Sequence, residues 1–192
     1  MKLHLIFQND DSGQIAEVTP APNARLTDEH GAAESDEQFL RRIAKIVVPP
    51  GVSWRIVGAH QLPASRRIFR DAWRESGSGD IVVDMHVARR FVLNGVRNAR
   101  NEKLEETDGE KSRLDEIGTP AQRERHAEYR QALRDFPKVI ESQISVIRSP
   151  QELADHPIVW PNGATTSVYD LKACGEVLVY AKKMESAKRK IS

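Results

Sequence analysis

The side chains in this chain that are best suited to bind a metal or transfer a proton are its histidines. They stand far apart, at His4, His30, His60, His86, His126 and His156. No two of them have the H-x-H, H-E-x-x-H or Cys-His spacing that places two ligands side by side on a strand or a helix. We therefore expect no metal site, and we interpret each histidine as a surface or capping residue.

Serine chemistry and nucleotide binding also lack their motifs. No G-x-S-x-G occurs, and Ser76 and Ser78 lie in the run Ser76-Gly77-Ser78-Gly79, which is too flexible to hold a nucleophile in place. The same run lacks the third glycine of a dinucleotide loop and the Gly-Lys-Ser/Thr end of a P-loop. The sequence therefore predicts a protein that is not an enzyme, has no catalytic residues and binds no cofactor.

Arginines between residues 66 and 100 form a basic stretch with Phe69 and Trp73 interleaved, a pattern found in nucleic-acid-binding proteins. The chain as a whole has 29 basic and 28 acidic residues, and this formal net charge of +1 gives no general attraction for phosphate backbones. The acidic run from Glu102 to Glu116 also balances the arginines. We favour solvated helix faces and expect no nucleic-acid partner, with a nucleic-acid-binding regulator as the weaker alternative.

The single cysteine, Cys174, excludes an internal disulfide and a thiolate zinc cluster, which favours synthesis in a reducing cytoplasm. No apolar run approaches the roughly 20 residues that a membrane span needs. The apolar residues 3–7 are followed by acidic turn residues too soon to form a signal peptide. We therefore expect no membrane association.

Hydrophobic patterning predicts a small antiparallel sheet with one covering helix in residues 1–75. The predicted strands are residues 3–7, 15–18 and 53–57. Ser35 and Gln38 form an S-x-x-Q capping box, which opens a helix that should end before Pro49. Residues 66–73 predict one or two further helical turns.

The segment 76–83 is rich in glycine and serine and is predicted to be a linker. After it, residues 84–137 have apolar side chains at alternating three- and four-residue steps, which predict two amphipathic helices. Thr119 and Gln122 form a capping box that opens the second helix, and Pro137 is expected to end it. These helices should form an antiparallel hairpin whose thin apolar stripe needs cover from another chain or domain.

Residues 138–192 are predicted to be an extended segment and a C-terminal helix. The expected elements are a strand at 144–147, a short helix capped by Ser149 and ending before Pro157, and an extended segment with a turn at 159–163. A last helix should begin at Ser167, continue through Met184 and finish at residues 188–190. The fold class is therefore predicted as α+β, with a small N-terminal sheet and helix, a helical hairpin and a C-terminal helical extension.

Three motifs stand out in the second half of the chain. They are an arginine-led segment ending in Leu104-x-x-Thr107-Asp108, the block Tyr-Arg-Gln-Ala-Leu-Arg-Asp-Phe-Pro at 129–137, and Trp160-Pro161. Together they resemble the tail-assembly chaperone family of tailed bacteriophages and prophages. Residues 48–73 are similar to the leader of many small proteins from tail-fibre regions. The sequence departs from the family at Gly109, where an aromatic residue is usual, in the long gap before Trp160, and in the additional residues 162–192.

The resemblance implies a non-enzymatic phage tail or tail-fibre accessory that acts as an assembly chaperone through protein–protein contacts in the host bacterial cytoplasm. Its partner would be a tail or tail-fibre protein, with self-association open. The alternative is a structural virion protein of the tail, baseplate or fibre that stays in the particle. The hypothetical partner-binding residues are Tyr129, Arg130, Leu133, Arg134, Phe136, Trp160 and Pro161. Of these, Tyr129, Leu133 and Phe136 should pack in the hairpin, whereas Arg130 and Arg134 should meet acidic groups of the hairpin or partner.

Overall fold

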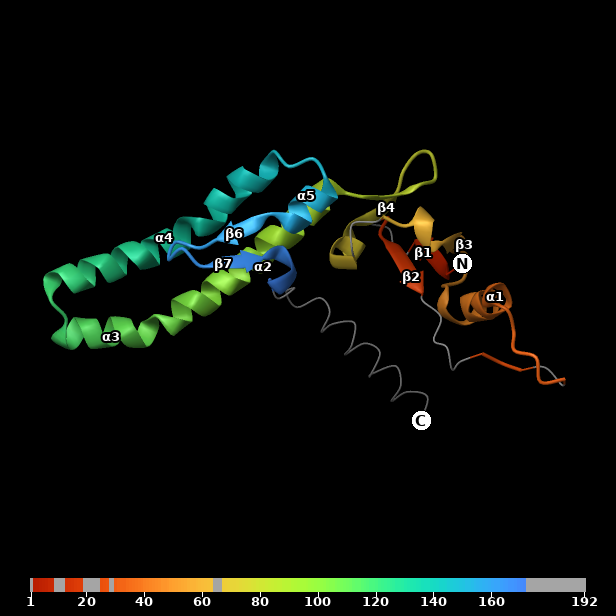
Figure 1. The fold of residues 1–192 in the computed structure, drawn as a ribbon, viewed down its shortest axis with the longest axis horizontal. Coiled ribbons are helices and arrows are strands. Elements are labelled where there is room, and N and C mark those ends of the chain that lie inside the picture. The colour runs from red at the N-terminus through yellow and green to blue at the C-terminus, as the bar shows by residue number, and fades with distance from the viewer. Residues whose placement is uncertain (1, 9–12, 19–24, 28–29, 64–66, 172–192) are drawn as a thin grey trace. The chain divides into compact units, whose positions relative to one another are not determined.

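The computed structural model confirms the predicted α+β class (Figure 1). It describes residues 2–8, 13–18, 25–27, 30–63 and 67–171. The chain divides into two compact units, Met1–Val87 and Ala88–Ser192. The first unit contains the sheet and the second contains the helical hairpin.

The first unit is built on a three-stranded antiparallel sheet with the order β2-β1-β3. Its strands are β1 (Leu3–Gln8), β2 (Ile15–Val18) and β3 (Trp54–Gly58), as the sequence predicts. Helix α1 (Asp36–Val47) covers one face, and its residues Phe39 and Leu40 pack with Leu5 of β1. The predicted capping box is confirmed, because Ser35 Oγ accepts from the Gln38 amide at 3.2 Å. A short 3₁₀ turn, η2 (Ala59–Gln61), follows β3.

A second β-hairpin covers the opposite face of this sheet. Its strands β4 (Trp73–Glu75) and β5 (Ile81–Val83) are antiparallel, and Trp73 and Ile81 pack with Ile6 and Val57. The prediction that residues 76–83 are a linker is therefore wrong. The Gly/Ser run is the turn of the hairpin, where the Ser76 amide donates to the Asp80 carbonyl at 2.8 Å. The apolar side chains that flank the run fix its ends in the core.

A buried polar cluster lies on the same face of the sheet. Nδ1 of His4 is 2.7 Å from Oε1 of Glu17, and the two side chains are 4% and 1% exposed. Arg70 reaches them from η3 (Arg67–Ala72), the predicted helical turns, with Nε 3.5 Å from Oε2 of Glu17. Since a buried carboxylate is costly without a cationic partner, this cluster ties η3 to β2.

The second unit contains the predicted helical hairpin. Its first arm consists of α2 (Met85–Glu106) and α3 (Asp108–Ile117), and its second arm is α4 (Pro120–Ser145). Thr119 and Gln122 form the expected capping box, with Pro120 at the first helical position. Helix α3 packs along the first half of α4.

The sequence predicts that Pro137 ends the second helix. This prediction is wrong, because Pro137 lies inside α4. Apolar side chains are buried on both sides of it, at Leu133, Phe136, Ile140 and Ile144. A proline inside a helix costs about 3 kcal/mol, whereas burying an isoleucine contributes about 1.5–3 kcal/mol. Two isoleucines beyond the proline therefore offset its cost. The strand predicted at 144–147 is wrong for the same reason, because its first residues belong to α4.

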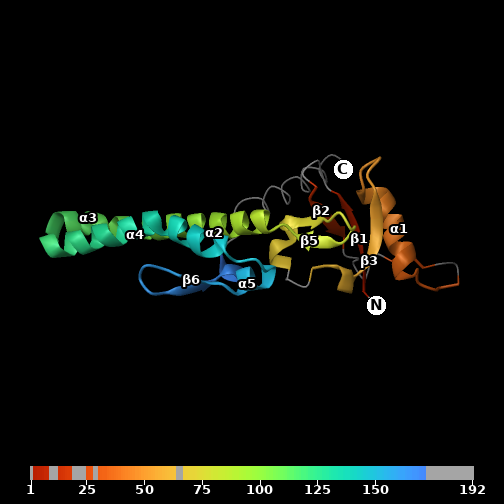
Figure 2. The ribbon, with the colours of Figure 1, turned by 90° about the horizontal axis from the view of Figure 1, so that it is seen from above.

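The chain then folds back over the hairpin through α5 (Pro150–Asp155), β6 (Pro157–Val159), β7 (Thr165–Ser167) and η4 (Val168–Asp170). Ser149 caps α5 as predicted, and strands β6 and β7 pair antiparallel around the turn at 161–163. Figure 2 shows the β6–β7 hairpin running alongside the helix pair. The last predicted helix falls mostly on residues 172–190, which lie outside the described residues.

This returning segment, residues 150–171, supplies the cover that the hairpin stripe requires. Its buried side chains are Leu153, Ala154, Ile158, Trp160, Val168 and Leu171. Gly95 of α2 lies so close to Leu171 that a Cβ at Gly95 would be 3.0 Å from the Leu171 Cβ. The sequence predicted cover by another chain or domain, whereas here the same unit covers the stripe.

Candidate partner-binding site on the helical hairpin

Arg130 connects two of the three motifs that carry the resemblance. Its Nη1 donates to the Leu104 carbonyl at 3.1 Å and to Thr107 Oγ1 at 2.5 Å, and it pairs with Asp108 Oδ1 at 2.7 Å. The Arg130 side chain is 12% exposed. The Leu104-x-x-Thr107-Asp108 motif thus binds the side chain of Arg130, the first arginine of the Tyr-Arg-Gln-Ala-Leu-Arg-Asp block.

The groups that accept from Arg130 lie at the end of α2. The amide and the hydroxyl of Thr107 both donate to the Leu104 carbonyl, at 3.2 and 2.7 Å, and this tight turn separates α2 from α3. Carbonyls at a helix C-terminus carry partial negative charge, so they favour a cation such as Arg130. At Gly109, where the family has an aromatic residue, an added Cβ would have no atom within 4 Å.

Trp160 connects the third motif to the other two. Its ring lies 4.6 Å from the Phe136 ring, measured between centroids, and Lys103 Nζ lies 5.0 Å from the Trp160 ring centroid. The indole Nε1 donates to Thr166 Oγ1 at 2.8 Å across the β6–β7 hairpin. Trp160 therefore occupies a groove of its own chain, between α2 and α4.

The seven predicted partner-binding residues are consequently divided between interior and surface. Leu133, Phe136 and Trp160 are buried in the core of the second unit. Tyr129 and Arg130 are half-buried, and Arg134 and Pro161 are exposed. Of the seven, Arg134 and Pro161 are thus the exposed residues, whereas the buried ones pack inside the second unit.

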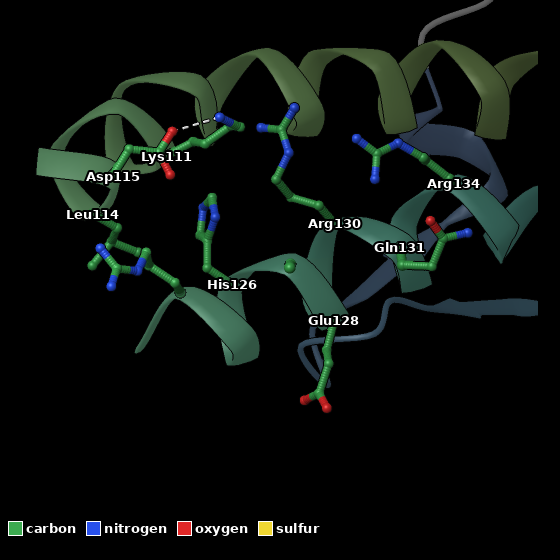
Figure 3. Close-up of a pocket in the computed structure, with 10 residues that line it drawn as sticks. Lys111, Leu114, Asp115, His126, Glu128, Arg130, Gln131 and Arg134 are labelled. Carbon is green, nitrogen blue, oxygen red and sulfur yellow. Dashed lines mark hydrogen bonds and ion pairs between the residues drawn. The ribbon is translucent and has the colours of Figure 1, made fainter. Parts of the chain in front are cut away.

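A pocket of about 460 Å³ lies between α3 and α4, next to Arg130 (Figure 3). Its lining residues are Lys111, Leu114, Asp115, Arg123, His126, Ala127, Glu128, Arg130, Gln131 and Arg134. In Figure 3, His126, Arg130 and Arg134 extend from α4 toward the first arm, whereas the Glu128 side chain points to the opposite side of α4. Four of the ten lining residues are lysine or arginine, and Leu114 and Ala127 supply the apolar part of the lining.

Two of the cationic side chains in the pocket are already neutralised. Lys111 donates to Asp115 Oδ2 at 2.6 Å, and Arg130 is paired with Asp108. The hydrogen bond from Lys111 is the main cause that lowers the pKa of Asp115, and the nearby charges of Arg123 and His126 lower it further. By contrast, His126 Nε2 is buried without a hydrogen-bond partner among the described residues.

No protein-family model, curated protein or solved structure matches this chain. The tail-assembly function therefore stays a prediction from the three motifs. Within the described residues, no helix is long and apolar enough to cross a membrane. The pocket and the motif contacts are the features of the second unit from which a binding role can be argued.

Sequence reasoning missed several residues of this pocket. Lys111, Leu114 and Arg123 are not among the predicted site residues, and His126 is predicted to be a surface or capping residue, although all four line the pocket. A signal was present, because Arg123, His126, Arg130 and Arg134 recur at three- and four-residue steps and so share one face of a helix. Polar residues at that spacing are easily attributed to a solvated face, because the spacing does not show that α3 lies opposite.

Proposed function

We propose that this protein is a non-enzymatic accessory of phage tail or tail-fibre assembly, which acts as a chaperone by binding its partner with the distal hairpin. The distal hairpin is defined as residues 107–132, which include α3 and the first half of α4. The phage context rests on the resemblance of the three motifs. Their mutual contacts, through Arg130 and Trp160, support the interpretation of these motifs as one structural unit.

The observation that carries the binding role is the thin interior of the distal hairpin. Among its residues, all of which the structure describes, Leu114 is the one buried side chain. In both ribbon views, this part of the hairpin continues past the β6–β7 hairpin (Figures 1 and 2). Helices in proteins gain most of their stability from packing, so a partner that covers this region would stabilise the distal hairpin. The ordered hairpin would in turn give the partner a defined binding surface.

The alternative, a structural protein retained in the virion, is favoured by the packing of residues 150–171 onto the hairpin. The chain departs from the resembling family in the long gap before Trp160 and in residues 162–192, and both additions contribute buried side chains to the second unit. Quantifying the protein in purified particles separates the two roles. A fixed copy number per particle selects the structural role, and presence in infected-cell lysate without particle association selects the chaperone.

The direct test is co-expression with the product of the neighbouring tail-fibre gene, followed by size-exclusion chromatography and hydrogen exchange of the complex. We expect one complex of defined stoichiometry in which amides of residues 107–132 exchange more slowly than in the free protein. Amides of the β1–β3 sheet serve as the internal control and should be unchanged. Separate elution of the two proteins, or protection confined to the first unit, would contradict the proposal.

A further inference from the structure

Three cationic side chains of the pocket have no hydrogen-bond or ion-pair partner among the described residues. They are Arg123, His126 when protonated, and Arg134. The other two cationic groups, Lys111 and Arg130, are neutralised by Asp115 and Asp108. Arg123 and His126 interact electrostatically with nearby Asp115, but the hydrogen-bonding groups of all three side chains are open to a bound anion.

The spacing of these groups defines the length of the anion. Arg123 and Arg134 are eleven positions apart on one helix, which corresponds to roughly 16 Å along its axis at 1.5 Å per residue. An extended peptide covers that distance with about five residues at 3.3 Å each. A single small anion is too short to reach both arginines, whereas a short peptide with several carboxylates spans them.

The surroundings of the pocket disfavour a nucleic acid. Glu110 and Asp115 lie close enough to His126 for its charge to lower the pKa of both carboxyl groups, although hydrogen bonds from Arg113 and Lys111 are the larger causes. A nucleic acid carries a phosphate at every nucleotide and would have to place some of them beside these carboxylates, whereas a peptide can place an uncharged residue there. The apolar lining residues Leu114 and Ala127 suit an aliphatic side chain between the acidic ones.

We propose that the pocket between α3 and α4 binds an acidic peptide segment of the partner protein, with an aliphatic residue over Leu114 and carboxylates at Arg123, His126 and Arg134. The proposal rests on the proposed function in taking the occupant to be a protein. It deepens that function because it gives the chemistry that a tail or fibre protein must present. The occupant is thus an acidic segment of about five residues.

The test uses the full chain and the capped peptide acetyl-Glu-Glu-Leu-Glu-Glu-amide, with acetyl-Gln-Gln-Leu-Gln-Gln-amide as the uncharged control. Binding is followed by the ring ¹⁵N and ¹H resonances of His126 and by titration calorimetry. We expect saturable binding of the acidic peptide with a Kd on the order of 1 mM or tighter, and at least about tenfold weaker binding of the glutamine peptide.

Variants then locate the site. Arg123→Gln with Arg134→Gln should weaken binding of the acidic peptide at least about tenfold. Arg125→Gln is the matched control, because this exposed arginine of α4 does not line the pocket, and it should leave binding within about twofold. The unfolding midpoint of each variant verifies its fold. If the double variant is unstable, Arg134→Gln alone, which changes an exposed side chain, provides the same comparison.

Several outcomes overturn the inference. They are equal binding of both peptides, equal loss in the Arg125→Gln control, or no shift of the His126 resonances. Tighter binding of a ten-nucleotide oligothymidylate would assign the pocket to nucleic acid, and dimerisation abolished by the double variant would assign it to a second copy. If the acidic peptide does not bind but the complex with the fibre protein still forms, this inference alone is overturned. Peptide binding at the pocket without any fibre-protein complex overturns the proposed function and leaves the pocket chemistry in place.

Discussion

Arg130 is the residue whose role the structure defines most fully. A carbonyl at the end of α2 and a hydroxyl accept hydrogen bonds from one guanidinium nitrogen, which also forms an ion pair with the Asp108 carboxylate. The carbonyl and the hydroxyl fix the position of Arg130, because Asp108 is 63% exposed and its ion pair is screened by water. This explains physically why an arginine in the second helix accompanies a Leu-x-x-Thr-Asp motif in the first. The contact joins both arms next to the pocket.

The corresponding prediction is that Arg130→Gln lowers the free energy of unfolding of the second unit by about 2–3 kcal/mol, since charge-assisted bonds to partly buried groups are lost. Arg130→Lys should be intermediate, because an ammonium keeps the charge but lacks the planar fork. Denaturant unfolding followed by hydrogen exchange of α3 measures both. Arg134→Gln on the same helix face is the control and should change stability little. Equal stability of wild type and Arg130→Gln would show that the contact is not a structural one.

At the scale of elements, the β6–β7 hairpin acts as the cover of the helix pair. Trp160 is 2% exposed and contacts Phe136 of α4 and Lys103 of α2, while its indole is bonded to Thr166. An aromatic side chain that has ring contacts and a bonded N–H contributes more than its buried area alone. The cover therefore depends on one side chain that reaches both arms.

We predict that Trp160→Ala destabilises the second unit by about 3–5 kcal/mol, as expected for removal of a buried aromatic side chain. Hydrogen exchange should become faster in the second half of α4, near Phe136, and in β6–β7. Val159→Ala in the same hairpin is the matched control, because Val159 is 52% exposed, and it should cost less than about 1 kcal/mol. A loss as small as that of the control would mean that the returning segment does not hold the hairpin together.

At the scale of the whole molecule, acidic side chains with lowered pKa values occur in both units. Hydrogen bonds are the main cause in each case, from Arg42 to Glu34, from Arg113 to Glu110 and from Lys111 to Asp115. A carboxyl group whose pKa is lower in the folded state stabilises the fold at pH values above its ordinary pKa. That contribution is lost as the pH falls through the folded pKa.

Stability should therefore be constant near neutral pH and decrease as the pH falls below the ordinary pKa values of 4.5 for Glu34 and Glu110 and 3.8 for Asp115. The urea midpoint measured from pH 6 down to about pH 3 tests this expectation. Lys111→Gln removes the main cause of the shift at Asp115, so this variant should lose less stability over the same range. A midpoint that rises on acidification would contradict the assigned direction.

The sequence by itself determined the elements whose signals are local. The capping boxes at Ser35 and Thr119 place helix starts, because the bonds that they make lie within four residues. The strands of the β1–β3 sheet and the antiparallel hairpin follow from alternation and from three- and four-residue spacing. These patterns report which side of an element is apolar, and they do so whatever the element packs against.

The tertiary structure decided everything that depends on distant partners. Pro137 stays inside α4 because burial of Ile140 and Ile144 offsets the lost hydrogen bond. The Gly/Ser run at 76–79 is a turn because Trp73 and Ile81 pack into the sheet. The pocket exists because the turn at Thr107 and its contact with Arg130 bring α3 beside α4. Such contacts join residues far apart in sequence, and their free energies override local preference.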